Sequence, residues 1–459
     1  MTFDYDLAII GSGGAAFAAA IRASTLGARA AVIERGEIGG TCVNVGCVPS
    51  KTLLAAADAF HQASSHPFDG VPTSAGRPDL RALVAQKDEL VSGLRKAKYI
   101  DLAPVYGFEI LHGQASFADS DTLRIDGREV RSRSYLVATG AEPAVPDIPG
   151  LREAGYLTST TAMELGGVPR RLVTIGGGFV GMEQGQLFSR LGAEVTIIGR
   201  LAPRAEPELA DWIGQAFADE GIRVVPERVA RVERDGDTTV VVTDRGTRIE
   251  TDAILVAVGR APRVADLDAV SAGIALDERG FIAVDDEQRT SNHRVFAAGD
   301  VTGGSQFVYT AAAQGNVAAE NALTDSHRKV DYLGLPSVIF TSPSLASAGM
   351  TEAEALAAGY ACDCRVLELA DVPRAIVNRD TRGAVKLVAD TGTRKVLGVH
   401  AVADNAGELM LAATYAIRFG LTVEDMASTW APYLTMSEAL KLVAQSFRAD
   451  VKKLSCCAA

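Results

Sequence analysis

The chain has 459 residues, which at about 150 residues per domain corresponds to roughly three domains. Hydrophobic residues make up 47% of the chain and charged residues 22%, which excludes disorder as the main state. Lys and Arg total 45 against 57 Asp and Glu, and the net charge of −12 argues against a nucleic-acid-binding protein, which needs a basic face. The N-terminus lacks the basic region and cleavage site of a secretory signal, and prolines interrupt the longest uncharged stretch. We therefore expect a cytoplasmic protein that does not insert into a membrane.

The N-terminal segment has the pattern of a strand, a glycine-rich turn, a helix and a second strand. An apolar run precedes Gly11, Gly13 and Ala16, and a second apolar run ends at Glu34. Such a turn lets the backbone approach a pyrophosphate, which then faces the free amides of the helix N-terminus. Glu34 is placed to accept hydrogen bonds from a ribose diol, as FAD or NAD would require.

The same pattern recurs later in the chain. An apolar run precedes Gly176, Gly178 and Gly181, and a second run ends at Gly199, at the same offset from the first glycine as Glu34 in the first unit. A single glycine motif is weak evidence, but two copies in the same context predict two dinucleotide-binding units.

The second unit differs from the first at the residue that would face the ribose. Gly199 replaces the carboxylate, and Arg200 and Arg204 follow it. Guanidinium groups without a carboxylate suit a 2′-phosphate, so we expect this unit to prefer NADPH. The alternative is that both arginines are solvated surface charges.

Three further segments look like strands that return to these units, at 135–141, 254–260 and 294–300. After Pro336 the pattern changes to strand-like runs followed by helical stretches. We predict an α/β fold with two Rossmann-like domains and a C-terminal α+β domain. The predicted boundaries are 1–150 with 266–335 for the first domain, 151–265 for the second, and 336–459 for the third.

Two cysteines follow the first unit in the segment GGTCVNVGCVPSK, residues 39–51. Cys42 and Cys47 at the start of a helix would face one another about one turn apart, which permits a disulfide. A helix N-terminus and Lys51 would lower a thiol pKa and favour the thiolate. The alternatives are two structural cysteines or half of a metal site, although no second Cys or His pair for zinc lies nearby.

This segment resembles the redox-active disulfide of the pyridine nucleotide–disulfide oxidoreductases. The resemblance extends over both nucleotide-binding units, the Ala-Thr-Gly turn at 138–140, the Gly-Asp pair at 299–300 and the C-terminal domain. It implies a homodimer in which NADPH reduces FAD and the flavin reduces a disulfide. The cysteine matching Cys47 would lie next to the flavin, and the one matching Cys42 would exchange with substrate.

The resemblance also implies functions for the domains and for single residues. The three domains would bind FAD, bind NADPH and form the dimer, respectively, and Lys51 would lie near the reactive end of the flavin, paired with Glu183. The expected FAD site consists of Gly11, Gly13, Ala16, Glu34, Gly36, Thr41, Lys51, Ala115, Thr139, Gly140, Asp300 and Val308. The expected NADPH site consists of Gly176, Gly178, Gly181, Glu183, Arg200, Arg204 and Gly259.

The C-terminal domain departs from the relatives that act on thiol substrates. Those relatives carry a His followed five residues later by Glu, whereas this chain has Tyr433 and Glu438, and its six histidines lie elsewhere. Tyrosine is a poor proton shuttle near pH 7. A dihydrolipoamide- or glutathione-type reductase with another base remains the alternative.

The chain ends with the adjacent pair Cys456 and Cys457, preceded by two lysines. Neighbouring cysteines make a strained disulfide, but on a mobile terminus they form a trap for soft metals. We expect them to take Hg(II) from external thiols and to pass it to Cys42 and Cys47. A non-catalytic thiol protein that binds metal is the alternative from another class, although it would have no use for two nucleotide sites.

The terminal pair and the segment Lys98-Tyr99-Ile100-Asp101 resemble the mercury-reducing branch of this family. This resemblance implies that thiol-bound Hg(II) is reduced to Hg(0), with the hydroxyls of Tyr99 and Tyr433 beside the metal. It also implies that the tail of one subunit serves the active site of the other.

Two features lie outside this scheme. Cys362 and Cys364 would share one face of a strand, but no partner ligands are visible, so we interpret them as incidental. We also expect no N-terminal metallochaperone-like domain, because the first nucleotide-binding run begins within ten residues of Met1.

Overall fold

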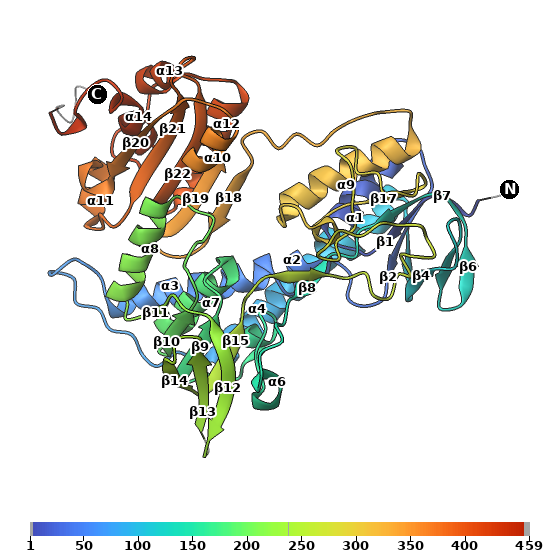
Figure 1. Ribbon diagram of the computed structural model, residues 1–459, viewed down its shortest axis with the longest axis horizontal. Helices are drawn as coiled ribbons and strands as arrows, with labels where there is room; N and C mark the ends of the chain where they lie inside the picture. The colour runs from blue at the N-terminus through green and yellow to red at the C-terminus, as the bar shows by residue number, and fades with distance from the viewer. Residues whose placement is uncertain (1–2, 237, 454–459) are drawn as a thin grey trace.

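The computed structural model describes residues 3–236 and 238–453, and it forms three lobes, each built around its own sheet (Figure 1). The predicted α/β class is confirmed. Among the described residues, no helix is long and apolar enough to cross a membrane.

The first lobe contains a parallel sheet of five strands in the order β17-β7-β1-β2-β3. Helices α1 (Gly14–Thr25) and α9 (Val308–Leu323) lie together on one face, where their apolar side chains form a common core with the sheet (Figure 1). The strands are β1 (Tyr5–Ile10), β2 (Ala30–Glu34), β3 (Glu109–His112), β7 (Ser132–Val137) and β17 (Val295–Ala297). A small antiparallel sheet of β4 (Ala115–Phe117), β5 (Leu123–Ile125) and β6 (Arg128–Val130) adjoins it.

The second lobe repeats this plan with a sheet in the order β11-β10-β9-β15. Its elements are β9 (Arg171–Ile175), α7 (Phe179–Arg190), β10 (Glu194–Ile198), α8 (Pro207–Asp219), β11 (Arg223–Val225) and β15 (Ala253–Val256). A three-stranded sheet of β12 (Val229–Asp235), β13 (Thr238–Thr243) and β14 (Arg248–Thr251) extends from it. Helix α6 (Leu151–Ala154) packs in the core of this lobe, and the paired strands β8 (Ala141–Pro143) and β16 (Arg260–Pro262) connect it to the first lobe.

The two glycine turns have the same geometry, which confirms the predicted repeat. Gly11 and Gly176 adopt φ of +103° and +110°. A Cβ atom on Gly11 would lie 2.3 Å from the carbonyl oxygen of Ala138, and one on Gly176 would lie 2.4 Å from that of Ala257. Only glycine fits both the backbone angle and the close approach of the neighbouring strand.

The third lobe has a five-stranded antiparallel sheet in the order β18-β19-β22-β21-β20, covered on one face by α12 and α14. Its strands are β18 (Pro336–Ile339), β19 (Ser344–Gly349), β20 (Cys362–Glu368), β21 (Ala384–Asp390) and β22 (Val396–Ala403). Its helices are α10 (Glu352–Ala357), α11 (Pro373–Asn378), α12 (Ala406–Arg418), α13 (Val423–Ser428) and α14 (Glu438–Gln445).

The segment after β2 connects the lobes. It forms α2 (Gly40–Asn44), α3 (Cys47–Ser64), α4 (Leu80–Arg95), a π-helical turn (Lys96–Ile100) and α5 (Leu102–Tyr106). Buried leucines of α3 and α4 pack in one apolar core with α7 of the second lobe and with strands of the third. Although this segment belongs to the first domain by sequence, it therefore fixes the position of the other two lobes.

A buried ammonium group ties α8 to the third lobe. Lys386 on β21 is 2% exposed, and its Nζ lies 2.9 Å from Glu206, 3.1 Å from Glu208 and 2.8 Å from Glu352. Glu206 is the residue immediately before α8 and is itself buried. In Figure 1, α8 reaches upward to this sheet.

We expect Lys386→Met to destabilise the protein by about 3–5 kcal/mol, because the buried Glu206 carboxylate would lose its cation. Denaturant unfolding followed by fluorescence measures this change. The control is Lys329→Met, which removes an exposed ion pair with Asp286 and should cost less than about 1 kcal/mol. Equal midpoints for the two variants would contradict the importance of the buried pair.

Candidate active site

A cavity of about 510 Å³ opens where the strands of the first sheet end. It is bounded by the glycine turn after β1, the end of β2, helix α2 and the N-terminus of α9. The predicted residues that line it are Gly11, Gly13, Glu34, Gly36, Thr41, Cys42, Cys47, Ala115, Thr139, Gly140, Asp300 and Val308. Two further predicted FAD residues do not line it: Ala16 is buried in the core beneath the turn, and Lys51 lies one helical turn beyond Cys47.

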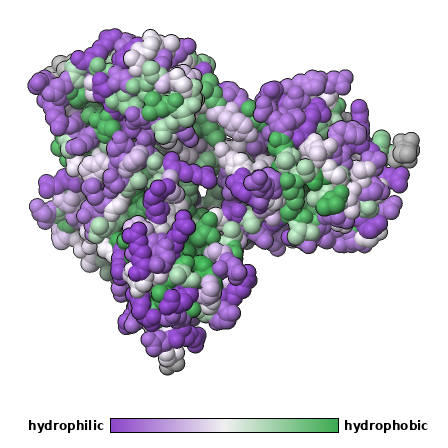
Figure 2. All heavy atoms as spheres, viewed as in Figure 1, coloured by the Kyte–Doolittle hydropathy of each residue, from purple (hydrophilic) through white to green (hydrophobic). Residues whose placement is uncertain are grey.

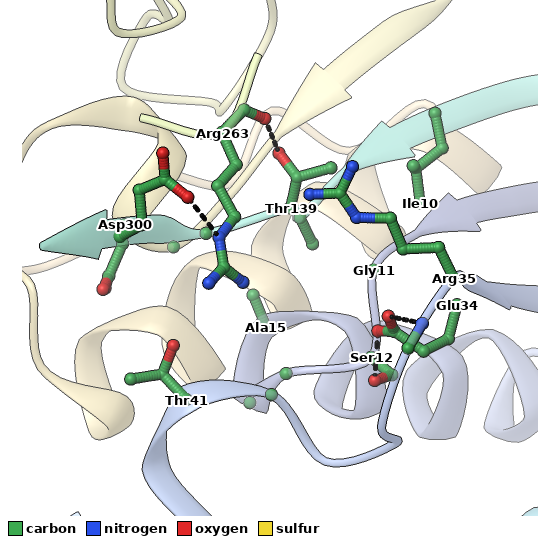
Figure 3. A pocket seen from close by; sticks show the side chains of 18 of the residues that line it. Ile10, Gly11, Ser12, Ala15, Glu34, Arg35, Thr41, Thr139, Arg263 and Asp300 are labelled. Atoms are coloured by element: carbon green, nitrogen blue, oxygen red, sulfur yellow. Dashed lines mark hydrogen bonds and ion pairs between the residues drawn. The ribbon is translucent and has the colours of Figure 1, made fainter. Parts of the chain in front are cut away.

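Glu34 is fixed at the end of β2 by two hydrogen bonds (Figure 3). Its Oε2 accepts from the Ser12 hydroxyl at 2.6 Å, and its Oε1 accepts from the Gly36 amide at 2.8 Å. The Ser12 oxygen in turn accepts from the Gly39 amide at 3.1 Å. The carboxylate is thus held in the cavity wall, where a ribose diol could donate to it. Ser12 was not among the residues predicted from the sequence.

The cavity has the donors that a dinucleotide needs. Helix α1 and the 16-residue helix α9 both begin in its wall, at Gly14 and Val308. Free amides and the positive ends of two helix dipoles there suit a pyrophosphate. Thr139 donates its hydroxyl to the carbonyl oxygen of Arg263 at 2.7 Å, which closes the cavity at the end of β7 (Figure 3). The residues present therefore fit FAD.

Asp300 lies in the wall of this cavity beside a side chain that sequence reasoning missed. The Nε atom of Arg260 lies 3.4 Å from Oδ2 of Asp300 and has no hydrogen-bond partner among the described residues. Burial raises the pKa of Asp300, and the Arg260 guanidinium opposes this. The Val-Gly-Arg sequence at 258–260, after a predicted strand, was the available signal.

The two cysteines lie on different helices, so the prediction of one helical start for both was wrong. Cys42 is in α2, and Cys47 is the first residue of α3. Helix α2 ends at Asn44, because the next residue, Val45, has a non-helical φ of −140°. A Cβ atom on Gly46 would lie 2.8 Å from the carbonyl oxygen of Thr41, so the turn between the helices favours glycine. Both thiols are free in this structure, and each shifts the pKa of the other.

The interaction between the two thiols makes them chemically different. It lowers the pKa of Cys47 to about 7, with the Lys51 ammonium adding to the effect and burial opposing it. The same interaction, together with burial, raises the pKa of Cys42 well above its ordinary value. The position of Cys47 at the N-terminus of α3 also favours a thiolate. Cys47 is therefore the thiol that ionises near neutral pH, and Cys42 keeps its proton there.

Residues from all three lobes orient the ammonium group beside Cys47. Lys51 pairs with Glu183 on α7 at 2.7 Å, so the ion pair predicted between them is present. The other oxygen of Glu183 accepts from the Phe340 amide of the third lobe at 3.0 Å. Lys51 Nζ also lies 4.6 Å from the centre of the Phe340 ring. These contacts place Glu183 beside Lys51. Phe340 is a second contact that the sequence did not reveal.

Of the two predicted tyrosines, one lies at the cysteine pair. Tyr99 lies in the π-helical turn with its ring edge-to-face against Phe17 at 4.7 Å. Its pKa is raised by burial and then by the charges of Cys42 and Cys47, so its hydroxyl stays protonated at neutral pH. Tyr433, between α13 and α14, is half-exposed and does not line the cavity.

Glu438 begins α14 and is buried, and its Oε2 has no hydrogen-bond partner among the described residues. The adjacent pair Cys456 and Cys457 lies outside the described residues.

The predicted NADPH residues gather at the end of the second sheet. Gly176 and Gly178 form the turn between β9 and α7, Gly181 lies in the first turn of α7, and Gly259 precedes β16. Arg200 and Arg204 are exposed in the loop after β10. The loop therefore presents both guanidinium groups to solvent, where they can meet a phosphate.

At the start of α7, the ring of Phe179 lies 5.9 Å from that of Phe307, which stacks on Tyr309 at 5.2 Å. This places an aromatic row between the second lobe and the start of α9.

Two family models together cover nearly the whole chain. The model for pyridine nucleotide-disulphide oxidoreductases matches residues 5–315, and the model for their dimerisation domain matches residues 335–444. The chain belongs to the pyridine nucleotide-disulphide oxidoreductase family. Enzymes of this family use FAD and NADPH, which confirms the predicted cofactors, and the dimerisation domain supports the predicted homodimer.

Several relatives of this chain within the family are mercuric reductases. A mercuric reductase from Staphylococcus aureus is 48% identical over 462 residues, which cover 99% of this chain and 84% of the relative. One from Streptomyces lividans is 51% identical, over 99% of this chain and 98% of the relative. Among solved structures, the HOCl-induced flavoprotein disulfide reductase RclA from Escherichia coli is 31% identical. It has a TM-score of 0.86 and covers 96% of this chain and 99% of its own.

We expect Lys51→Met to raise the pKa of Cys47, because the variant loses the cation that stabilises the thiolate. In the wild type, alkylation of Cys47 by iodoacetamide should accelerate as the pH rises through about 7, where the thiolate forms. In the variant, the same acceleration should occur at higher pH. Mass spectrometry of the peptide containing Cys47 follows the reaction, and Lys329→Met is the control. An unchanged profile for Lys51→Met would show that the ammonium does not act on this thiol.

Proposed function

We propose that this protein is an NADPH-dependent, FAD-containing mercury(II) reductase of the cytoplasm, which reduces thiol-bound Hg(II) to Hg(0). The observation that carries the proposal is the near-complete match to mercuric reductases, at 41–51% identity over 98–99% of the chain. The polarised pair of Cys42 and Cys47 supports it, because a thiolate beside a thiol can displace the ligands of a soft metal.

We propose the sequence-based residue assignments as the cofactor sites of this enzyme. FAD would be held by the residues in the cavity wall, with its pyrophosphate at the start of α1 and its ribose at Glu34. NADPH would bind at the turn between β9 and α7, with its 2′-phosphate near Arg200 and Arg204. When bound, FAD relays two electrons from NADPH toward the cysteine pair. The domain boundaries at 150, 265 and 335 remain part of this proposal.

The chain's own residues perform the exchange of metal ligands. The Cys47 thiolate and the Cys42 thiol each replace one external thiolate on Hg(II), so two sulfur–mercury bonds form as two break. The Cys42 proton leaves with a departing thiolate. The protonated Tyr99 hydroxyl is a hydrogen-bond donor beside the two sulfurs. Once Hg(II) has gained two electrons, Hg(0) leaves because it binds thiolates weakly, and the cysteine pair is restored.

We propose that Tyr433, Glu438 and the terminal pair Cys456 and Cys457 act on the partner's active site. Tyr433 lies on a lobe with large exposed apolar side chains, including Trp430 at 97% and Phe419 at 75% exposure, which a second copy can cover. Figure 2 shows hydrophobic patches on this lobe within a mainly hydrophilic surface. The terminal cysteines would receive Hg(II) and hand it to Cys42 and Cys47 across the dimer.

A thiol–disulfide reductase is the second candidate, because the similar RclA structure is a flavoprotein disulfide reductase. The buried Glu438 is also the acid that such enzymes pair with histidine. In this chain Tyr433 occupies the histidine position, and tyrosine does not exchange protons readily near pH 7. Turnover with a disulfide in the absence of Hg(II) would favour this candidate.

We expect purified enzyme to oxidise NADPH when HgCl2 is added in excess thiol and to release volatile mercury. Cys42→Ser and Cys47→Ser should each abolish this activity, because two thiolates are needed to displace both external ligands. The double variant Cys456→Ala/Cys457→Ala should retain the FAD spectrum but lose activity when external thiol is abundant. Rapid oxidation with a disulfide and none with Hg(II) would contradict the proposal.

We expect the double variant Arg200→Ala/Arg204→Ala to raise the KM for NADPH by roughly tenfold or more, since a charge-assisted hydrogen bond contributes about 1.5–3 kcal/mol. The KM for NADH should stay unchanged, because NADH lacks the 2′-phosphate. Steady-state kinetics with both cofactors measure the effect, and Arg228→Ala, an exposed arginine of the same lobe, is the control. A parallel rise in both KM values would show that the arginines do not read the phosphate.

A further inference from the structure

Cys362 and Cys364 lie on β20, which is the edge strand of the C-terminal sheet. Neither residue lines the cavity of the first lobe. Their strand pairs without interruption with β21, from Cys362 opposite Asp390 to Glu368 opposite Ala384. Because successive side chains of a strand alternate between faces, both thiols lie on the same face.

The contacts of Asp363 and Arg365 show that these two side chains lie on the opposite face of the strand from the thiols. Asp363 and Arg365 point to the other side, where Arg365 lies over the Phe447 ring and Asp363 pairs with Arg394. The charge of Glu352 on α10 acts on both thiols and raises the pKa of each. The two sulfurs are therefore neighbours beside one carboxylate, and both residues are partly exposed.

This pair is poorly placed to close a disulfide. Positions two apart on a strand are separated by about 6.6–6.8 Å, at the outer limit of the Cα separation of disulfides, and their Cβ atoms run parallel. Burial and then the Glu352 carboxylate raise the pKa of each thiol, so both stay protonated and resist oxidation at neutral pH. Both thiols are free in the structure.

The number of ligands selects the kind of metal. Within residues 3–236 and 238–453, no group of three or more His, Cys, Asp or Glu side chains is placed to hold a metal ion. Zinc, which takes four ligands, is thereby disfavoured. A soft cation that binds two thiolates with linear geometry can bridge sulfurs that are too far apart for a disulfide.

We propose that Cys362 and Cys364 form a second Hg(II) site, a two-coordinate dithiolate on the edge of the C-terminal sheet. Hg(II) carried by two external thiolates exchanges onto the pair: two sulfur–mercury bonds break, two form, and the two cysteine protons leave with the released thiols. No electrons move in this step. The site takes metal from the same thiol-bound pool but does not depend on the reductase activity, so the two proposals can fail separately.

The test uses the full-length chain with Cys42, Cys47, Cys456 and Cys457 all changed to Ala, which leaves Cys362 and Cys364 as the only thiols among the six cysteines. The protein is mixed with HgCl2 in excess glutathione and desalted, and mercury and glutathione per chain are then measured. We expect one Hg(II) per chain and no glutathione. Adding Cys362→Ser should lower mercury retention by roughly 100-fold, because the chelate effect is lost.

A matched pair of measurements on the otherwise intact chain guards against misfolding of the multiple variant. Cys362→Ser/Cys364→Ser should bind one Hg(II) fewer than the wild type while its NADPH oxidation with HgCl2 is unchanged. The proposal is overturned if the stoichiometry does not fall. It is equally overturned if mercury in the multiple variant is retained only as one Hg–glutathione adduct on each thiol, because the two sulfurs then do not share a metal.

Discussion

The ion pair between Lys51 and Glu183 holds a positive charge one helical turn from Cys47, and this charge adds to the effect of Cys42 in lowering the pKa of that thiol. Glu183 comes from the second lobe and is fixed by the Phe340 amide of the third. The local sequence supplies this charge, and residues of the second and third lobes fix its position. Glu183, a buried acid of the second lobe, thus supports the Cys47 thiolate by holding Lys51 in place.

Helix α3 contacts the second lobe at more than one point along its length. Its first residue is Cys47. In its second half, Asp58 pairs with Arg190 of α7. The Arg190 guanidinium also lies 2.6 Å from Glu220, the residue after α8. The helix is thus anchored to the second lobe at Lys51 and at Asp58, while Lys386 ties α8 to the third lobe. Together these ion pairs hold α3, whose first residue is Cys47, against the second lobe.

The glycine turns, the alternation of strands and helices and the C-terminal lobe follow from local pattern, because glycine at positive φ and apolar periodicity are read directly from the residues. The sequence could not reveal the helix break at Gly46, which depends on close contact with Thr41. Nor could it assign Arg260 beside Asp300 or Phe340 beside Lys51, because these neighbours are distant in the chain. Tyr433 does not line the cavity of the first lobe, and the roles proposed for it and for the terminal cysteines depend on a second subunit.

The most direct test of this account is the long-wavelength absorbance that a thiolate produces when it lies against oxidised flavin, measured against pH in the FAD-loaded enzyme. With Cys42→Ser, which leaves Cys47 free, the account predicts a band that grows as the pH rises and the Cys47 thiolate forms. With Cys47→Ser, it predicts no such band near neutral pH, because Cys42 keeps its proton. A band that persists in Cys47→Ser and disappears in Cys42→Ser would contradict the assignment of Cys47 as the thiolate at the flavin.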